Sequence, residues 1–160
     1  MTAINYANKI SVETKDNQAF IVLHSIDNSR QPVKELRFLL DTGAFITTMQ
    51  KEMAIKHGFK VTVPNAIEIG GFGGSKIFCD LRVIPTLIFC GYKMQDVIIA
   101  TPTADKLPIT EVVGMNILEN FQFGVDFALC ELYANARGRY ISQKPKYQCG
   151  EVSLMDVAGG

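Results

Sequence analysis

Hydrophobic and polar residues alternate along most of this chain with a period of two, which is the pattern of strands buried on one face. Unbroken apolar runs indicate further strands that are buried on both faces. The strands expected from these two patterns cover residues 10–14, 19–26, 36–41, 60–63, 66–69, 76–78, 81–90, 94–100 and 109–113. Alternation over 121–125 and 129–133 predicts a late hairpin. The patterns therefore predict an all-β fold.

Helical spacing of apolar residues occurs at only two places, so we expect one or two short helices. The first covers residues 49–57, where Thr47 and Gln50 have the spacing of a capping box and Gly58 suits a C-cap. The side chains expected to face the core are those of Met49, Met53 and Ile55. The second covers residues 115–121, although a plain core segment has the same spacing.

Length and composition suit a single globular domain: 160 residues, of which 48% are hydrophobic and 20% charged. We expect this domain over residues 1–134 and a polar, poorly ordered tail over 135–160. Sixteen basic and sixteen acidic side chains cancel, which argues against nucleic acid or an anionic membrane as a partner. A signal-peptide pattern and a membrane-length apolar run are both missing, so we expect a cytoplasmic protein.

The four cysteines, Cys79, Cys90, Cys130 and Cys149, have neither the paired spacing nor the neighbouring histidines of a zinc site. We interpret them as reduced thiols of an intracellular protein, with disulfides as the less favoured alternative. No metal and no cofactor is expected.

The candidate chemistry begins where the apolar strand at 36–41 ends in Asp41-Thr42-Gly43. A carboxylate at the end of a core strand is costly to ionise unless it accepts hydrogen bonds, so its position needs a reason. An ordinary turn is the simplest alternative, because Asp, Thr and Gly all favour turns.

A second candidate segment is Gly70-Gly71-Phe72-Gly73-Gly74, with four glycines in five positions between two expected strands. Such density suggests a mobile hairpin or a close approach of backbone to ligand. The spacing matches neither a phosphate-binding loop nor a dinucleotide-binding motif. A flexible turn without function is the remaining alternative.

A third segment, 111–118, repeats the plan of 38–44: an apolar strand, a glycine turn and further apolar residues, which suggests two related halves.

Three segments, taken in chain order, resemble motifs of the retropepsins. Residues 39–44 resemble the active-site motif, 69–74 the flap tip, and 112–118 the Gly-x-Asn segment. These are single-domain aspartic proteases of retroviruses and their cellular and bacterial relatives. The resemblance implies a closed β-barrel that acts as a symmetric dimer.

An aspartic protease needs two carboxylates, and the chain supplies one Asp-Thr-Gly. The resemblance therefore implies a homodimer in which Asp41 of each copy faces the other and activates a water molecule. By resemblance, Thr42 stiffens the pair of carboxylates and Gly43 lets the substrate backbone approach. The residues expected to contact an extended peptide are Ala44, Gly70, Gly71, Phe72, Gly73 and Gly74.

Two positions depart from the viral pattern, in which an acidic residue follows Asp-Thr-Gly-Ala and an Arg follows the later Gly. Here these positions hold Phe45 and Met115, so a charged pair is replaced by apolar side chains. Two other functions remain open: a dimeric peptide-binding module with little or no turnover, and an unrelated β-barrel with a coincidental turn.

Overall fold

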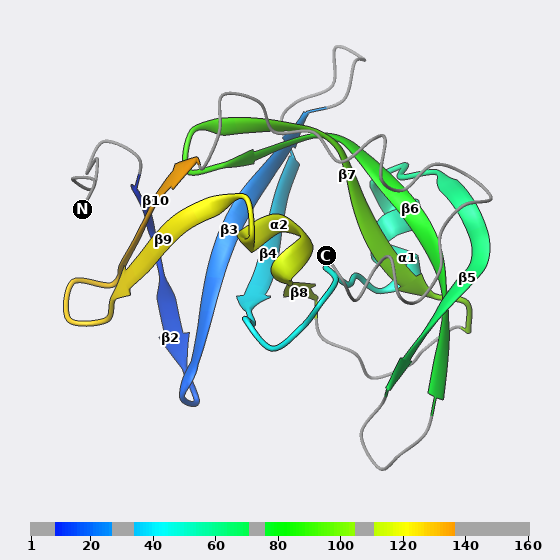
Figure 1. Ribbon diagram of the computed structural model, residues 1–160, viewed down its shortest axis with the longest axis horizontal. Helices are drawn as coiled ribbons and strands as arrows, with labels where there is room; N and C mark the ends of the chain where they lie inside the picture. The colour runs from blue at the N-terminus through cyan, green and yellow to red at the C-terminus, as the bar shows by residue number, and fades with distance from the viewer. Residues whose placement is uncertain (1–8, 27–33, 71–75, 105–110, 137–160) are drawn as a thin grey trace.

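The computed structural model describes residues 9–26, 34–70, 76–104 and 111–136, and the fold is given for these residues (Figure 1). Strands dominate it, and two short helices complete it. The elements are β1 (Lys9–Ser11), β2 (Glu13–Lys15), β3 (Gln18–Ile26), β4 (Lys34–Leu40), α1 (Lys51–Lys56), β5 (Val61–Gly70), β6 (Lys76–Phe89), β7 (Tyr92–Pro102), β8 (Val112–Val113), α2 (Met115–Leu118), β9 (Phe121–Asp126) and β10 (Glu131–Ala136). The predicted all-β class with short helices is confirmed.

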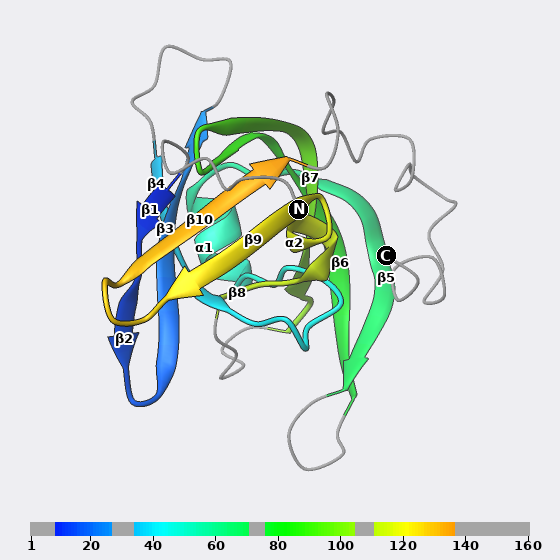
Figure 2. The same ribbon diagram turned by 60° about the vertical axis from the view of Figure 1, so that its left-hand side comes forward.

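The strands form two sheets that share a core. The smaller sheet has the order β1-β10-β9, and the larger has the order β5-β6-β3-β4-β8, with β2 added on β3 and β7 on β6. Figure 2 shows the hairpin of β9 and β10 in front of the larger sheet. Within the described residues the pairing forms these two sheets and no closed ring of strands.

Two hydrophobic clusters fill the interior. The larger one draws side chains from both sheets, including the fully buried Phe38 of β4 and Leu132 of β10. The smaller one lies between β5, β6 and β7, where Cys79, Leu81 and Ala100 are fully buried. Along β4, buried Leu36 and Phe38 alternate with exposed Glu35 and Arg37, as the period of two requires.

Three predictions of where one strand ends and the next begins were wrong. The strand expected over 10–14 is divided at Val12: β1 pairs with β10, whereas β2 pairs with β3. Val12 is buried, and its N–H donates to the Cys130 carbonyl (2.8 Å), which holds the division in place. The segments 60–63 and 66–69 are one strand, β5, and 76–78 and 81–90 are likewise one strand, β6.

The break expected between the strands at 60–63 and 66–69 is an irregularity at Pro64 and Asn65 within β5. The pairing of β5 with β6 shifts register between Val61 and Val63 and again between Val63 and Ile67. Asn65 has a positive φ of 46°, and its N–H donates to Asp80 Oδ1 (2.7 Å). The chain therefore bulges at this point and does not reverse.

The first helix differs from its prediction in length and orientation. α1 has six residues, and its N-cap, Gln50, makes no side-chain capping bond. Met53 and Ile55 are 37% and 55% exposed, whereas Ala54 is fully buried, so the predicted core face was wrong for these two residues. Gly58 has φ +76° and its N–H donates to the Ile55 carbonyl (3.0 Å), which confirms a glycine at the helix end.

The second helix and the late hairpin agree with the sequence patterns. α2 is one turn long, shorter than the predicted 115–121, because β9 already begins at Phe121. β9 and β10 pair in regular antiparallel register. No helix in the described ranges combines the length and hydrophobicity needed to cross a membrane. The predicted domain boundary after residue 134 falls within β10, which runs to Ala136, and residues 137–160 of the predicted tail lie outside the described residues. Both the boundary and the tail stay predictions.

Three cysteines lie in the described part of the chain, and all three are free thiols. Burial raises the pKa of Cys79 and of Cys90 to about 12, with a smaller contribution from Asp80 at Cys79. Both thiols therefore stay protonated at neutral pH and behave as small core residues. Cys130 is exposed on the turn between β9 and β10, and Cys149 lies outside the described residues.

Candidate active site

Asp41 is positioned by a parallel pairing between the two segments with the repeated sequence plan. β4 pairs with β8, with Leu39 opposite Val112 and Leu40 opposite Val113. The N–H of Asp41 continues this ladder by donating to the Val113 carbonyl (3.2 Å). The backbone of Asp41 is therefore fixed by β8, although its side chain lies beyond the end of β4.

The Asp41 carboxylate accepts a local hydrogen bond, as the sequence argument required. The N–H of Gly43 donates to Asp41 Oδ1 (2.9 Å), and the N–H of Ala44 donates to the Asp41 carbonyl (3.2 Å). A Cβ on Gly43 would lie 3.2 Å from the same Oδ1. Glycine at position 43 thus leaves the half-buried Asp41 carboxylate uncrowded. Thr42 and Gly43 themselves are exposed.

A buried polar network lies beneath this turn. Asn116 Oδ1 accepts hydrogen bonds from both the N–H and the hydroxyl of Thr47 (2.8 Å each), and Asn116 Nδ2 donates to the Ile98 carbonyl (2.8 Å). The Thr47 hydroxyl in turn accepts the N–H of Gly114 (3.1 Å). Thr47 and Asn116 are both fully buried. Thr47 therefore connects the segment after Asp41 to the start of α2, and its predicted role as a helix cap was wrong.

Gly114 allows the backbone of the second segment to contact the first directly. A Cβ at this position would lie 2.6 Å from the Ile46 carbonyl carbon and 2.9 Å from the Ala44 oxygen. The next residue, Met115, donates its N–H to the Ala44 carbonyl (2.7 Å). Any side chain at position 114 would displace the loop that follows Asp41.

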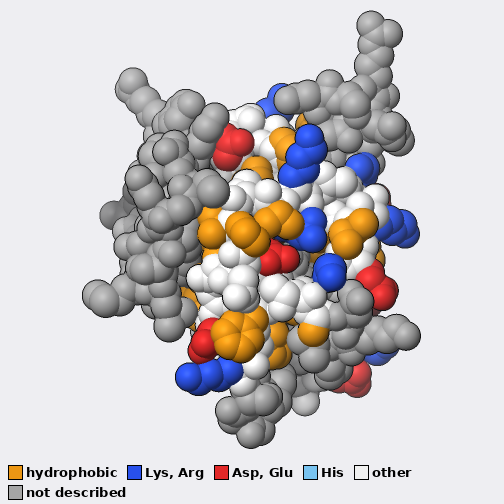
Figure 3. Space-filling view, turned by 90° about the vertical axis from the view of Figure 1, so that its right-hand side faces the viewer, with side chains coloured by type: hydrophobic (Ala, Val, Ile, Leu, Met, Phe, Trp, Pro, Cys, Tyr) orange, Lys and Arg blue, Asp and Glu red, His pale blue; other side chains and the backbone are white. Residues whose placement is uncertain are grey.

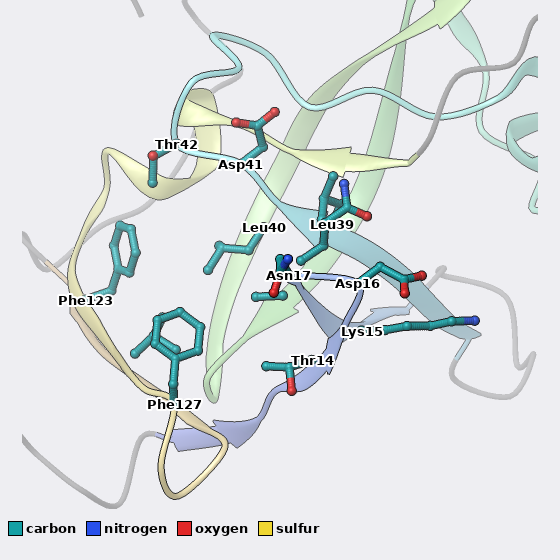
Figure 4. A pocket seen from close by; sticks show the side chains of 13 residues that line it. Thr14, Lys15, Asp16, Asn17, Leu39, Leu40, Asp41, Thr42, Phe123 and Phe127 are labelled. Carbon is teal, nitrogen blue, oxygen red and sulfur yellow. The ribbon is translucent and has the colours of Figure 1, made fainter.

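A hollow of about 1030 Å³ lies beside this turn and is lined by three parts of the chain. They are the turn between β2 and β3, the end of β4 with Asp41 and Thr42, and the apolar side chains Phe123, Val125 and Phe127. Figure 4 shows Phe123 and Phe127 facing into the hollow and the Asp41 carboxylate at its rim, directed away from both rings.

Comparison with solved structures shows which fold holds this turn. A retropepsin-like aspartic protease from Rickettsia conorii matches with a TM-score of 0.58 and 20% identity, over 78% of this chain and 97% of that chain. The chain has the retropepsin-like fold. The match removes the alternative of an unrelated β-barrel with a coincidental turn. EIAV protease in complex with the inhibitor HBY-793 also matches, with a TM-score of 0.48 and 20% identity over 65% of this chain and 88% of that chain. No family model and no curated protein matches the sequence.

Within the retropepsin-like fold, the predicted site residues fall into two groups. Asp41, Thr42, Gly43 and Ala44 form one turn, with Ala44 half-buried. Gly70 is the exposed last residue of β5 and pairs with Lys76, and no atom lies within 4 Å of a Cβ placed on it. The other predicted flap residues, Gly71, Phe72, Gly73 and Gly74, lie outside the described residues.

Sequence reasoning missed the other walls of the hollow. The turn at Asp16 and Asn17 and the strand β9 lie far along the chain from Asp41, and local patterns do not reveal such neighbours. Asp16 and Asn17 both have positive φ, which marks a tight hairpin turn but indicates no site.

Proposed function

We propose that this protein is an aspartic endopeptidase that acts as a homodimer and cleaves extended polypeptides. The observation that carries the proposal is the position of Asp41 at the end of β4. There the Asp-Thr-Gly turn rests on β8 and on the Thr47–Asn116 network. The turn belongs to a retropepsin-like fold, and the similar structure from Rickettsia conorii is named an aspartic protease.

The second carboxylate has to come from another copy of the chain. Asp16 also lines the hollow, but Figure 4 shows its side chain pointing away from Asp41. A symmetric dimer supplies an identical Asp41 across a two-fold axis. Two carboxyl groups in contact cannot both ionise at low cost, so the pair holds one proton.

The chemistry of such a pair needs neither a metal nor a covalent intermediate. The ionised carboxyl takes a proton from a bound water, whose oxygen attacks the carbonyl carbon of the scissile bond. The protonated carboxyl donates a hydrogen bond to the carbonyl oxygen as negative charge develops there, and a proton passes to the leaving nitrogen. The peptide C–N bond then breaks and releases two shorter peptides.

The turn offers few free backbone groups to a substrate. Ala44 uses its N–H on the Asp41 carbonyl and its own carbonyl on the Met115 N–H. The N–H of Gly43 is committed to Asp41 Oδ1, whereas its carbonyl has no partner in the described part of the chain. We therefore assign the acceptor for the substrate backbone to Gly43 and only a side-chain contact to Ala44. Thr42 is exposed, and we assign it to contact the second copy.

The flap assignment completes the proposal. Gly70, Gly71, Phe72, Gly73 and Gly74 are proposed to close over the peptide, exclude water and donate backbone hydrogen bonds. The arms that carry this segment are the paired ends of β5 and β6, where Gly70 lies opposite Lys76.

The proposal is tested by mapping cleavage sites with mass spectrometry on a denatured-protein peptide library, from about pH 4 to pH 7. Wild type is compared with Asp41→Asn and with Asp16→Asn, which changes the other carboxylate of the hollow. We expect cuts between apolar residues from wild type and Asp16→Asn and none from Asp41→Asn. Equal cutting by Asp41→Asn refutes the proposal. No cuts from a dimeric wild type would favour the peptide-binding module.

A further inference from the structure

Exposed hydrophobic side chains are concentrated on one short stretch of the described chain. Three of the seven large hydrophobic residues that are exposed there, Met53, Ile55 and Val61, lie on α1 or at the start of β5. Their exposed fractions are 37%, 55% and 41%. None of them lines the hollow beside Asp41, and Figures 1 and 2 show α1 on the side of the fold away from β9 and β10. This stretch is therefore separate from the candidate active site.

Lysines accompany these apolar side chains. Lys51 and Lys56 belong to α1 and Lys60 follows it, whereas Glu52 is the one acidic residue of the sequence 51–61. Lys56, Lys60 and Glu52 are exposed, and none of the three forms an ion pair in the part of the chain that the structure describes. Figure 3 views the molecule from the side of β5 and shows Lys and Arg side chains close together, with hydrophobic side chains between them.

The backbone after α1 holds this stretch in a fixed shape. The N–H of Phe59 donates to the Ala54 carbonyl (3.0 Å) and closes a Schellman turn around Gly58. The carbonyl of Lys60 then accepts the N–H of Val83 on β6 (3.3 Å). The turn keeps Lys60 close to the end of the helix, so a partner would not have to order the backbone on binding.

A buried cation lies beneath the same turn. Arg82 of β6 is only 7% exposed, and it donates from Nη1 to the Phe59 carbonyl (2.7 Å) and from Nε to Thr101 Oγ1 (3.0 Å). Asp80, two residues earlier, accepts the N–H of Asn65, and Arg82 forms no ion pair with a described carboxylate. A buried charge without a counter-charge is costly. An acidic group at this turn would therefore be attracted by Arg82 as well as by the lysines.

Two further lysines add positive charge at the ends of the helix. Lys34 Nζ donates to the His57 carbonyl (2.9 Å), and Lys51 Nζ donates to the Thr103 carbonyl (3.2 Å). Burial lowers the pKa of His57, and Lys34 and Lys56 lower it further, as expected beside several cations. The chain as a whole has no net charge, so this excess is local. We call residues 51–61 with Lys34 and Arg82 the α1 surface; its charged side chains are Lys34, Lys51, Lys56, Lys60 and Arg82 against Glu52.

We infer that the α1 surface is a docking site for an acidic segment of the protein substrate that also carries apolar side chains. The acidic groups would lie against the lysines, and the apolar ones against Ile55 and Val61. The inference rests on the proposed function in naming the substrate as the partner. A segment held on the α1 surface leaves the hollow beside Asp41 open, because none of residues 51–61 lines that hollow.

Two other anionic partners suit this surface less well. An anionic membrane binds helices with a long apolar face, whereas α1 has six residues and carries Glu52 in its first turn. A nucleic acid contacts cations mainly through its phosphates and would leave the exposed Met53, Ile55 and Val61 without an apolar partner.

Defined peptides test the docking site without cleavage if they are bound to the Asp41→Asn protein. Fluorescence anisotropy compares a peptide of alternating Glu and Leu with a Gln/Leu peptide and a Glu/Ser peptide. We expect the Glu/Leu peptide to bind most tightly, and its affinity to fall between about 0.05 M and about 0.5 M NaCl. Tighter binding of phosphatidylserine vesicles or of a DNA oligonucleotide overturns the inference, as does a Glu/Leu peptide that does not bind.

Matched variants of the same protein locate the site. Lys56→Glu and Lys60→Glu reverse a charge on the α1 surface, and Lys93→Glu does so at an exposed residue near the start of β7. Each of the first two should weaken binding of the Glu/Leu peptide by about three- to tenfold, because repulsion replaces attraction, and Lys93→Glu should not. Ile55→Ser should also weaken binding, whereas Val22→Ser, at an exposed apolar residue of β3, should not. Circular dichroism shows whether each variant keeps its fold. Equal effects of the three charge reversals overturn the inference.

Cleavage kinetics separate this inference from the proposed function. Two substrates share one apolar cleavage site and differ in a flanking segment, which is Glu/Leu in one and Gln/Leu in the other. We expect a higher kcat/KM for the Glu/Leu substrate through a lower KM, and no such difference in Lys56→Glu combined with Lys60→Glu. Equal kcat/KM values from wild type refute the docking of substrate and keep the proposed function. A protein that binds the Glu/Leu peptide at the α1 surface but cuts nothing refutes the proposed function and keeps the acidic docking site.

Discussion

Substituting Thr47 by Val tests whether the buried network holds the Asp41 loop. Valine has nearly the same shape as threonine but lacks the hydroxyl. The hydroxyl donates to Asn116 Oδ1 (2.8 Å) and accepts the N–H of Gly114 (3.1 Å). Asn116 Oδ1 keeps its bond from the Thr47 N–H, whereas the buried Gly114 N–H is left without an acceptor.

The expected loss follows from these two bonds. Losing the donated bond costs about 0.5–1.5 kcal/mol, and leaving a buried N–H unpaired costs about 1–3 kcal/mol. The free energy of unfolding should therefore fall by about 2–4 kcal/mol, a large part of the roughly 5–15 kcal/mol typical of a domain. The melting temperature should fall by about 5–15 °C.

The matched control is Thr62→Val on β5, where the half-buried hydroxyl makes one long bond to the Leu81 carbonyl (3.3 Å). This change should cost about 1 kcal/mol or less. Urea unfolding of wild type, Thr47→Val and Thr62→Val measures both losses. The comparison holds when the free energy of unfolding has the same slope against urea concentration in all three proteins. If Thr47→Val costs no more than Thr62→Val, the network does not hold the loop.

Two further predictions concern the loop after Asp41 and the end of α1. Gly114→Ala should lower both stability and peptide cleavage, because its Cβ would lie 2.6 Å from the Ile46 carbonyl carbon; unchanged urea midpoint and cleavage rate would contradict this. Burial, with smaller effects of Lys34 and Lys56, lowers the pKa of His57, so the unfolded chain binds the proton more tightly. Stability should therefore fall as pH drops below about 6.5, and less so in His57→Gln; parallel melting curves for the two proteins from pH 7.5 to pH 5.5 would contradict this.

The strands and the Asp41 turn were predictable because their causes are local. Alternation along β3 and β4 reflects one buried face of each strand. The late hairpin follows from the same alternation. The costly carboxylate at the strand end needed a donor, and the Gly43 N–H two residues away provides it.

The errors arose where a side chain uses a distant partner. Thr47 has the spacing of a cap for α1, but its hydroxyl bonds to Gly114 and Asn116, nearly seventy residues away. Met53 and Ile55 lie on a helix of six residues, too short for its periodicity to show which face is buried. The hollow beside Asp41 was not predictable for the same reason, since its walls come from the two ends of the domain.

The two positions that depart from the viral pattern now have a structural account. Phe45 packs against the smaller hydrophobic cluster and Met115 against the larger one. The bond from the Met115 N–H to the Ala44 carbonyl (2.7 Å) joins the two segments through the backbone. Apolar packing on both sides and one backbone bond thus hold the loop where the viral pattern has a charged pair, and neither position buries a charge. By the resemblance to the retropepsins, the acidic residue of the viral pattern also holds substrate backbone, and this chain has Phe45 at that position. Under the proposed function, the grip must then come from the Gly43 carbonyl and the flap, so peptide affinity should depend more on backbone contacts and less on salt concentration.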